Sequence, residues 1–245
     1  MAIDESLKKA RAAIRAARKD GNTELQLGTI GWDPTSIPDA IGKLERLESL
    51  QVNAVAITDF SPLAGFRQLH SLAIGSVRDV DLGPIGQLTD LRELEITGDG
   101  VTELEFLRPL TNLKSLHIQG PIKDWEPLSG LTKLKHLALQ SDDQTDITPL
   151  SKLTRLESLS LTDGSITDLS PLSKLTKLQV LEFYWGFIKE IGPLASLKKL
   201  RKLKLNATYE VKDLSPLFGL KSLKELKLSD CTGLTQKEKD RFRKA

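Results

Sequence analysis

The sequence predicts an α/β solenoid in which units of about 22 residues stack so that their short strands form one parallel sheet. Three observations lead to this fold class. A six-residue leucine pattern recurs at a nearly constant interval, a motif that starts a helical turn lies between successive copies, and a helical pattern stands at each end of the chain. Such internal periods are typical of repeat proteins, whose units bury their apolar side chains only against one another.

The first 22 residues predict a helix that caps the stack. Asp4 is suited to be its N-cap, and Gly21 is suited to the left-handed position that follows a helix end. The apolar residues fall on one face of this helix: Leu7, Ala10, Ile14 and Ala17.

The pattern LxxLxL predicts the strands. Its central leucine recurs at steps of 21 to 23 residues, at Leu50, Leu72, Leu94, Leu116, Leu137, Leu159, Leu181, Leu203 and Leu226. Leu25 and Leu27 form a tenth, degenerate copy. Because side chains alternate along a strand, the leucines of LxL point inward and the residues between them point outward. We therefore expect about ten short parallel strands.

The motif D-x-S-P-L lies between strands, as at residues 59–63, 168–172 and 213–217. A Ser or Thr followed by Pro is typical of a helix N-cap with proline in the first turn. The motif therefore predicts short helical turns on the side of the stack opposite the sheet.

The repeat length and these two motifs resemble bacterial leucine-rich repeat proteins of the internalin-like kind, from about residue 23 to residue 234. The resemblance implies a right-handed, curved solenoid with the sheet on its concave side, and binding of a partner protein through that concave face. One column departs from the family. Five residues after the central leucine, where Asn is usual, this chain has residues such as Val77, Thr208 and Cys231.

The domain organisation predicted is a single leucine-rich repeat domain over residues 1–245. Residues 1–22 form the N-terminal capping helix, residues 23–234 the repeats, and residues 235–245 a C-terminal capping helix. Thr235 and Glu238 have the spacing of a capping box, and the helix offers Phe242 to the stack. With a cap at each end, we expect a complete domain and a monomer.

The charge excludes a general attraction to nucleic acid. The chain has 35 basic and 33 acidic residues, a net charge of +2. Residues 1–122 carry a net charge of −4 and residues 123–245 a net charge of +6, so an anionic contact belongs in the C-terminal half.

The sequence shows no sign of export or membrane insertion. Cys231 alone cannot form an intramolecular disulfide, and no run of 18 apolar residues or secretory signal is present. We expect a cytoplasmic protein without membrane insertion; a secreted or surface location is the alternative if a leader was removed.

The sequence contains no motif of a catalytic or metal site, so we expect no enzyme activity, no cofactor and no metal. Cys231 lies in the turn column, where a structural thiol is favoured over a nucleophile. His117 and His136 occupy outward positions of successive repeats, near Glu93 and Glu95. A metal site there is the alternative to two solvated histidines, which the sequence favours because no third ligand has a known spacing.

The aromatic segment 182–187 predicts the principal binding site. Phe183 has the inward register, Tyr184 points outward, and Trp185 lies at the rim or packs over Gly186. Rigid exposed rings beside charges are typical of interaction hot spots. The predicted partner-binding residues are Glu182, Tyr184, Trp185, Lys202, Lys204 and Asn206; the secondary candidates are Glu93, Glu95, His117 and His136.

These observations predict a module that binds a partner protein with an acidic patch through the concave face and catalyses no reaction. Nucleic acid is disfavoured, because single-strand binding uses several stacking aromatics and this chain has one cluster. Two alternatives remain: a secreted bacterial effector or surface adhesin that binds a host protein, and a metal-dependent enzyme or metal-binding protein.

Overall fold

The computed structural model describes residues 2–28, 36–53, 57–78, 80–141, 146–162, 165–208 and 210–243. The chain divides into two compact units, Met1–Pro121 and Ile122–Ala245. Both units are built from the same repeat. The single domain over residues 1–245 stays a prediction.

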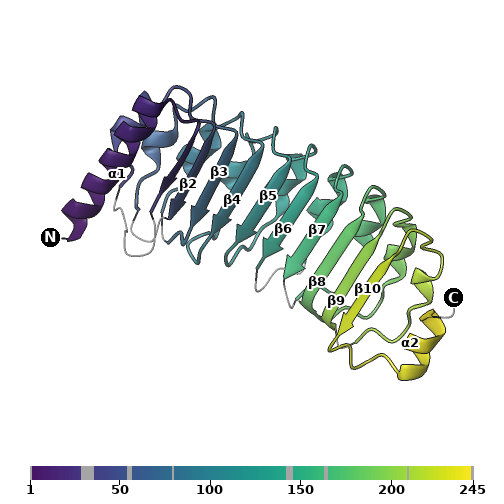
Figure 1. Cartoon of the computed structure of the whole chain (residues 1–245). Helices are drawn as coiled ribbons and strands as arrows, with labels where there is room; N and C mark the ends of the chain where they lie inside the picture. Colours follow the sequence, from purple (N-terminus) through teal and green to yellow (C-terminus); the bar gives the residue numbers. More distant parts are fainter. Residues whose placement is uncertain are drawn as a thin grey trace. The chain divides into compact units, whose positions relative to one another are not determined.

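The first unit contains a long helix followed by five parallel strands that pair in the order of the sequence (Figure 1). These elements are α1 (Ala2–Asp20), β1 (Glu24–Leu27), β2 (Ser49–Asn53), β3 (Ser71–Gly75), β4 (Glu93–Thr97) and β5 (Ser115–Gln119). Short 3-10 helices lie between the strands: η1 (Asp39–Lys43), η2 (Ser61–Leu63), η3 (Gly83–Gln87) and η4 (Glu105–Leu107).

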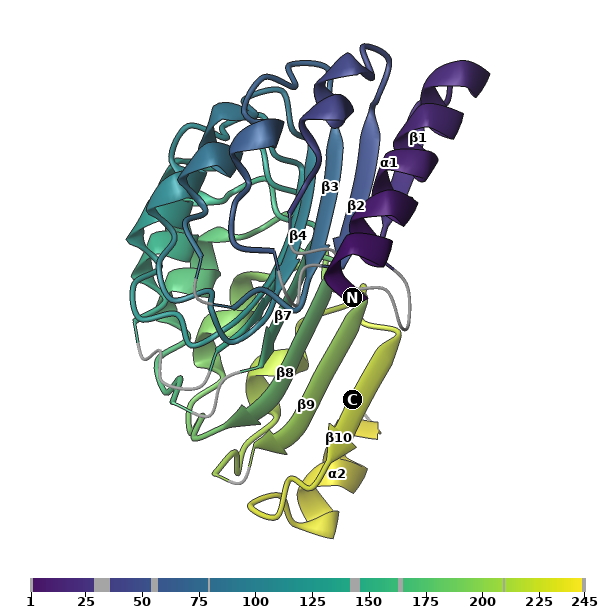
Figure 2. The ribbon, with the colours of Figure 1, turned by 90° about the vertical axis from the view of Figure 1, so that its left-hand side faces the viewer.

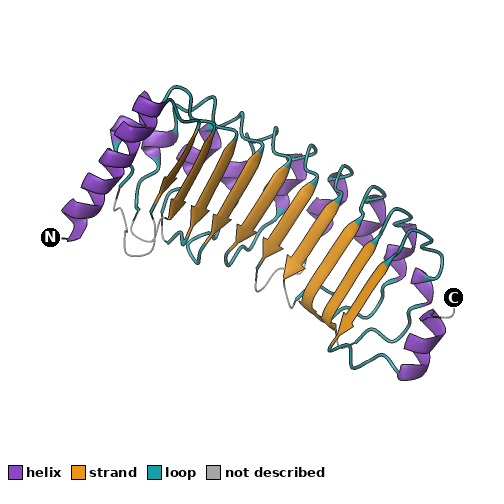
Figure 3. Ribbon diagram, in the orientation of Figure 1, coloured by secondary structure: helices purple, strands orange, loops and turns teal. Residues whose placement is uncertain are grey.

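The second unit repeats this arrangement and ends in a short helix. Its strands are also parallel and pair in sequence order: β6 (His136–Gln140), β7 (Ser158–Thr162), β8 (Val180–Gly186), β9 (Lys202–Thr208) and β10 (Glu225–Ser229). Its helices are η5 (Glu126–Gly130), η6 (Thr148–Lys152), η7 (Ser170–Lys174), η8 (Gly192–Ser196), η9 (Ser215–Leu217) and α2 (Gln236–Arg243). Within each unit the 3-10 helices lie on one side of the strands (Figures 2 and 3). The predicted solenoid of parallel strands and helical turns is confirmed.

The strands have the predicted register. Leu137 lies opposite Leu159 on the next strand, and both are buried. Ser158, one position before Leu159, is only half-buried on the outward face. In β10 the central Leu226 is also only half-buried, because β10 pairs with β9 on one side and, among the described strands, has no neighbour on the other.

The helical turns begin differently from the prediction. The first residue of η2 is Ser61, so Ser61 is not the N-cap, and Pro62 takes the second position. The residue that organises the turn is Asp59, whose Oδ1 accepts a hydrogen bond from the Ser61 backbone N–H at 2.7 Å. Asp168 does the same before η7, at 2.8 Å. The predicted N-cap role of Ser is therefore wrong: the aspartate of D-x-S-P-L forms the turn with its short carboxylate.

The N-terminal helix covers the first strand as predicted. It contacts β1 and η1 and buries Ala10, Ile14 and Ala17, with Gly21 in the left-handed conformation at φ 66°. Asp4 is not its N-cap, because the helix already begins at Ala2. No helix in the described ranges is long and apolar enough to cross a membrane.

The C-terminal helix starts at the predicted capping box. Thr235 Oγ1 accepts a hydrogen bond from the Glu238 N–H at 3.2 Å. The Glu238 carboxylate accepts one from the Leu214 N–H at 3.2 Å, which fastens α2 to the start of η9. The side chain of Phe242 lies outside the described residues.

The turn column after the strands uses substitutes for the usual asparagine. Cys231 is buried, and its Sγ donates to the Leu205 carbonyl at 3.3 Å, as expected for a structural thiol. In the repeat of Leu137, the buried Ser141 lies one residue before the turn column. Its hydroxyl donates to the Ile122 carbonyl at 2.9 Å. Different side chains therefore satisfy these buried carbonyls in different repeats.

The register predicts unequal effects of two substitutions on stability. Leu137→Ala should lower the free energy of unfolding by about 2–5 kcal/mol, because it removes a buried side chain and leaves a cavity. Ser158→Ala should change it by no more than about 0.5 kcal/mol. Urea unfolding followed by circular dichroism measures both; equal losses would contradict the register.

The aspartate turns predict an acid-sensitive contribution to stability. Hydrogen bonds from the following Ser or Thr hold the pKa of Asp59, Asp146 and Asp168 below the ordinary value. A lowered folded-state pKa favours the folded protein above the ordinary pKa, and this gain disappears as the pH falls through the folded-state pKa. The triple Asp→Asn variant should have a lower Tm than the wild type at pH 7, and this difference should be smaller at pH 3. A Tm difference at pH 3 as large as the difference at pH 7 would contradict a stabilising role of the ionised aspartates.

Candidate functional site

Strands β8 and β9 carry the predicted binding residues on the outward face of the second unit. Glu182 lies opposite Lys204, and Tyr184 lies opposite Asn206. Between them, Phe183 is buried with 2% exposure, as its inward register predicts. The alternation of a strand therefore holds the four outward residues on one surface.

Four of the predicted residues form one hydrogen-bonded cluster, here called the Tyr184 network: Glu182, Tyr184, Lys202 and Lys204. The Lys202 ammonium lies 2.7 Å from Glu182 Oε1, and the Tyr184 hydroxyl donates to Glu182 Oε2 at 3.0 Å. Lys204 Nζ donates to the Tyr184 hydroxyl at 3.0 Å and lies 4.2 Å from the ring centroid, a cation–π contact.

The network shifts the ionisation of its members. Burial raises the pKa of Glu182, but the hydrogen bonds from Lys202 and Tyr184, with the charges of both lysines, outweigh burial and hold this pKa below its ordinary value. The hydrogen bond and charge of Glu182 raise the pKa of Lys202. Both groups are therefore charged at neutral pH, and the side chain of Glu182 is only 18% exposed.

The lysines of this face differ in their partners. Lys202 is paired with Glu182, and Lys227 on β10 lies 3.0 Å from Glu225. The Lys204 ammonium contacts the hydroxyl and ring of Tyr184, and among the described residues no carboxylate lies within ion-pair distance of it. An ammonium has three donors, so Lys204 keeps donors for an acceptor from outside the chain.

Two aromatic residues follow Tyr184. The Trp185 side chain lies outside the described residues, so its rim position stays a prediction. Phe187, just after β8, is 55% exposed and is the only exposed large hydrophobic residue in the described part of the chain. Sequence reasoning gave Phe187 no role, although an aromatic directly after a strand that ends in Gly186 was the available signal.

The secondary candidates fall in different units. In the first unit Glu95 lies opposite His117, with Oε1 3.6 Å from Nδ1, and Glu93 is exposed on the same strand. His136 is exposed on β6 of the second unit, so its predicted proximity to His117 stays a prediction. Within the described ranges, no three His, Cys, Asp or Glu residues are grouped so that they could hold a metal ion.

Comparison with known proteins places the chain among solved bacterial structures. It matches no protein-family description and no curated protein at a significant level. It is similar to an internalin, InlF, of Listeria monocytogenes, with a TM-score of 0.76 and 30% identity over 94% of this chain and 73% of that one. Internalin C2 of the same species gives a TM-score of 0.68 and 27% identity over 77% of this chain and 88% of that one.

This chain is an internalin-like leucine-rich repeat protein. A leucine-rich repeat protein of Leptospira interrogans shares the fold alone, with a TM-score of 0.51 and 16% identity over 94% of this chain and 96% of that one. The internalin-like fold is generally that of a protein-interaction module, which presents an extended surface of repeated strands.

The Tyr184 network predicts a pH-dependent effect of Glu182→Gln. Because the folded-state pKa of Glu182 is lowered, its ionised form stabilises the folded protein at neutral pH, and this stabilisation is lost as the pH falls through that pKa. The variant should therefore have a lower Tm than the wild type at pH 7, and the difference should be smaller at pH 3. Calorimetric scans at both pH values measure it, with Glu190→Gln as a control outside the network.

Proposed function

We propose that this protein binds a partner protein through the outward face of β8 and β9, centred on the Tyr184 network, and that it catalyses no reaction. The observation that carries the proposal is the network itself, which joins four side chains of two neighbouring strands in one hydrogen-bonded cluster. Because these side chains are already hydrogen-bonded to one another, binding should lose less rotamer freedom than it would with unbonded lysines.

The charges of the face support a partner with an acidic patch. Glu182 neutralises Lys202, and Glu225 neutralises Lys227, whereas Lys204 is held over the Tyr184 ring. A partner carboxylate at Lys204 would form an ion pair and contact the aromatic ring at the same place. Tyrosine surrounded by charged residues is also the composition of an interface hot spot.

The apolar part of the proposed interface is Phe187. An exposed large side chain next to the Tyr184 strand gives a partner an apolar surface to cover, and covering it is favourable because it leaves water. With Trp185 as a predicted neighbour, it forms the edge of the proposed contact.

Binding of a partner captured from the native host and identified by mass spectrometry tests this proposal. Replacing Tyr184 and Trp185 together by Ala should weaken binding by about 2 kcal/mol or more, because aromatic anchors dominate interface energies. Calorimetric titration measures the affinity. The double variant Glu93→Gln, Glu95→Gln, on the secondary surface, should leave the affinity unchanged. If this variant weakened binding and the Tyr184 and Trp185 variant did not, the interface would lie on β4 and β5 instead.

The charge of the same face predicts an effect on the association rate. Lys202→Glu with Lys204→Glu should slow association and flatten its dependence on salt, because rim charges act mainly on the encounter of two proteins. Lys204→Gln alone should slow association more than Lys227→Gln, since Lys227 already has a carboxylate partner. Stopped-flow or surface-based kinetics at several salt concentrations measure these rates. Unchanged rates in all three variants would contradict an acidic patch on the partner.

A further inference from the structure

One repeat departs from the others in the motif between strands. Of the eight helices η2 to η9, seven have proline in their first two positions, and η4 does not. Its second position holds Phe106 instead. The first position of the motif holds Glu103 here, where most other repeats have aspartate and the repeat of η8 has Glu190.

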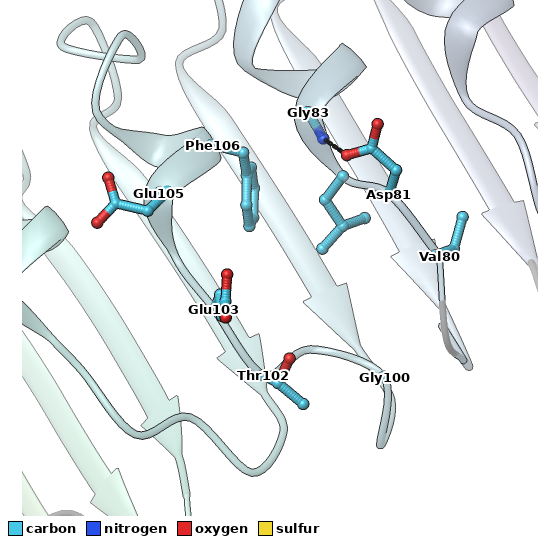
Figure 4. Close-up of a pocket in the computed structure, with 9 residues that line it drawn as sticks. Val80, Asp81, Gly83, Gly100, Thr102, Glu103, Glu105 and Phe106 are labelled. Atoms are coloured by element: carbon cyan, nitrogen blue, oxygen red, sulfur yellow. Dashed lines mark hydrogen bonds between the residues drawn. The ribbon is translucent and has the colours of Figure 1, made fainter.

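A hollow of about 410 Å³ lies where this departure occurs, between the segments that lead into η3 and η4 (Figure 4). Its apolar lining includes Val80, Leu82 and Phe106, and Gly100 contributes bare backbone. Phe106 is half-buried, so part of its ring remains available to a ligand. The volume falls within the range of small-molecule pockets.

The backbone of Phe106 lies close against the preceding repeat. A Cβ placed on Gly86 of η3 would lie 2.8 Å from the Phe106 carbonyl oxygen, closer than real Cβ atoms approach. Glycine at this position therefore lets η4 pack directly on η3. The ring of Phe106 therefore extends from a backbone that packs closely on the preceding repeat.

The three carboxylates of the hollow differ in their partners. Asp81 Oδ1 accepts the Gly83 N–H at 2.7 Å, as drawn in Figure 4. Glu105 points away from the Phe106 ring and accepts two hydrogen bonds from Arg108, at 2.6 and 3.0 Å. Glu103 forms no hydrogen bond or ion pair in the described part of the chain, although it lines the same hollow as Phe106.

Acidic residues predominate around the hollow, although Arg108 pairs with Glu105 and the Arg78 backbone lies beside Gly100. The segment from residue 81 to residue 105 contains a single basic residue, Arg92. It contains seven acidic residues: Asp81, Asp90, Glu93, Glu95, Asp99, Glu103 and Glu105. A cationic ligand is attracted to such a surface, and an anionic one is repelled.

We infer that this hollow binds an arginine side chain of a partner protein. The aliphatic stem covers Val80 and Leu82, the planar guanidinium stacks on the Phe106 ring, and its N–H groups pair with the Glu103 carboxylate. Arginine fits better than lysine because its delocalised, weakly hydrated cation both stacks on aromatic rings and donates two parallel hydrogen bonds to a carboxylate. The site is separate from the Tyr184 network and takes the opposite charge.

Nuclear magnetic resonance titration of the whole ¹⁵N-labelled chain with the peptide acetyl-Gly-Arg-Gly-amide tests the inference. Saturable shifts should occur at the backbone amides of Gly83, Gly100 and Thr102. The lysine peptide should bind at least threefold more weakly, and the glutamine peptide should not saturate. Tighter binding of acetyl-Gly-Leu-Gly-amide than of the arginine peptide would overturn the inference, because it would mark a purely apolar site.

Two variants distinguish binding in the hollow from a general attraction of the peptide to acidic residues. Phe106→Pro introduces the residue found at this position in η2, η3 and η5 to η9, and we expect the fold to be kept because the Glu-Pro pair it creates already exists at Glu126 and Pro127. Both Phe106→Pro and Glu103→Gln should weaken binding of the arginine peptide at least fivefold. Glu190→Gln, at the matching position of a repeat with proline, should leave it unchanged. Equal affinity in all three variants, or shifts spread over every acidic segment, would overturn the inference.

Discussion

The structure depends on one constraint: no repeat can bury its own leucines. A strand of five residues has two inward side chains, and these are shielded only when the strands before and after it lie in register, as Leu137 does opposite Leu159. A strand shifted by one residue would turn its leucines outward, so the register is kept even where the interval differs from 22 residues, as in the pairing of Leu203 with Leu226. The half-buried Leu226 of β10 shows how burial falls where a neighbouring strand is present on one side only.

This constraint explains why the strands could be predicted from the sequence and the turns less well. Period and leucine register identify each strand independently of its surroundings, and the ten predicted strands are all present. In D-x-S-P-L, Asp and Ser are both capping residues, and only the backbone conformation decides which of them bonds the free N–H. Asp59 makes that bond. The N-cap prediction for Asp4 is wrong for a related reason: a sequence pattern gives a helix end only to within one or two residues, and the helix begins at Ala2.

The candidate site was predictable as a column of residues but not as a network. Alternation placed Tyr184 and Lys204 on the outward face, and the pairing of β8 with β9 brings them together. Side-chain rotamers decide which lysine pairs with which carboxylate, and the sequence does not contain this information. It therefore did not indicate that one oxygen of Glu182 pairs with Lys202 and the other accepts the Tyr184 hydroxyl. Phe106 was overlooked because its signal is a missing proline, which is visible only after all the repeats are aligned on their turns.

The pairing of each strand with its neighbours in the sequence also bears on how the chain folds. Within each unit, strand partners are separated by about one repeat, so forming a pair closes a loop of some twenty residues and never requires the chain ends to meet. The entropy lost at each step is small and similar from repeat to repeat. Folding of such an array can nucleate at whichever pair of adjacent repeats is locally most stable. It then propagates to the next repeat in either direction.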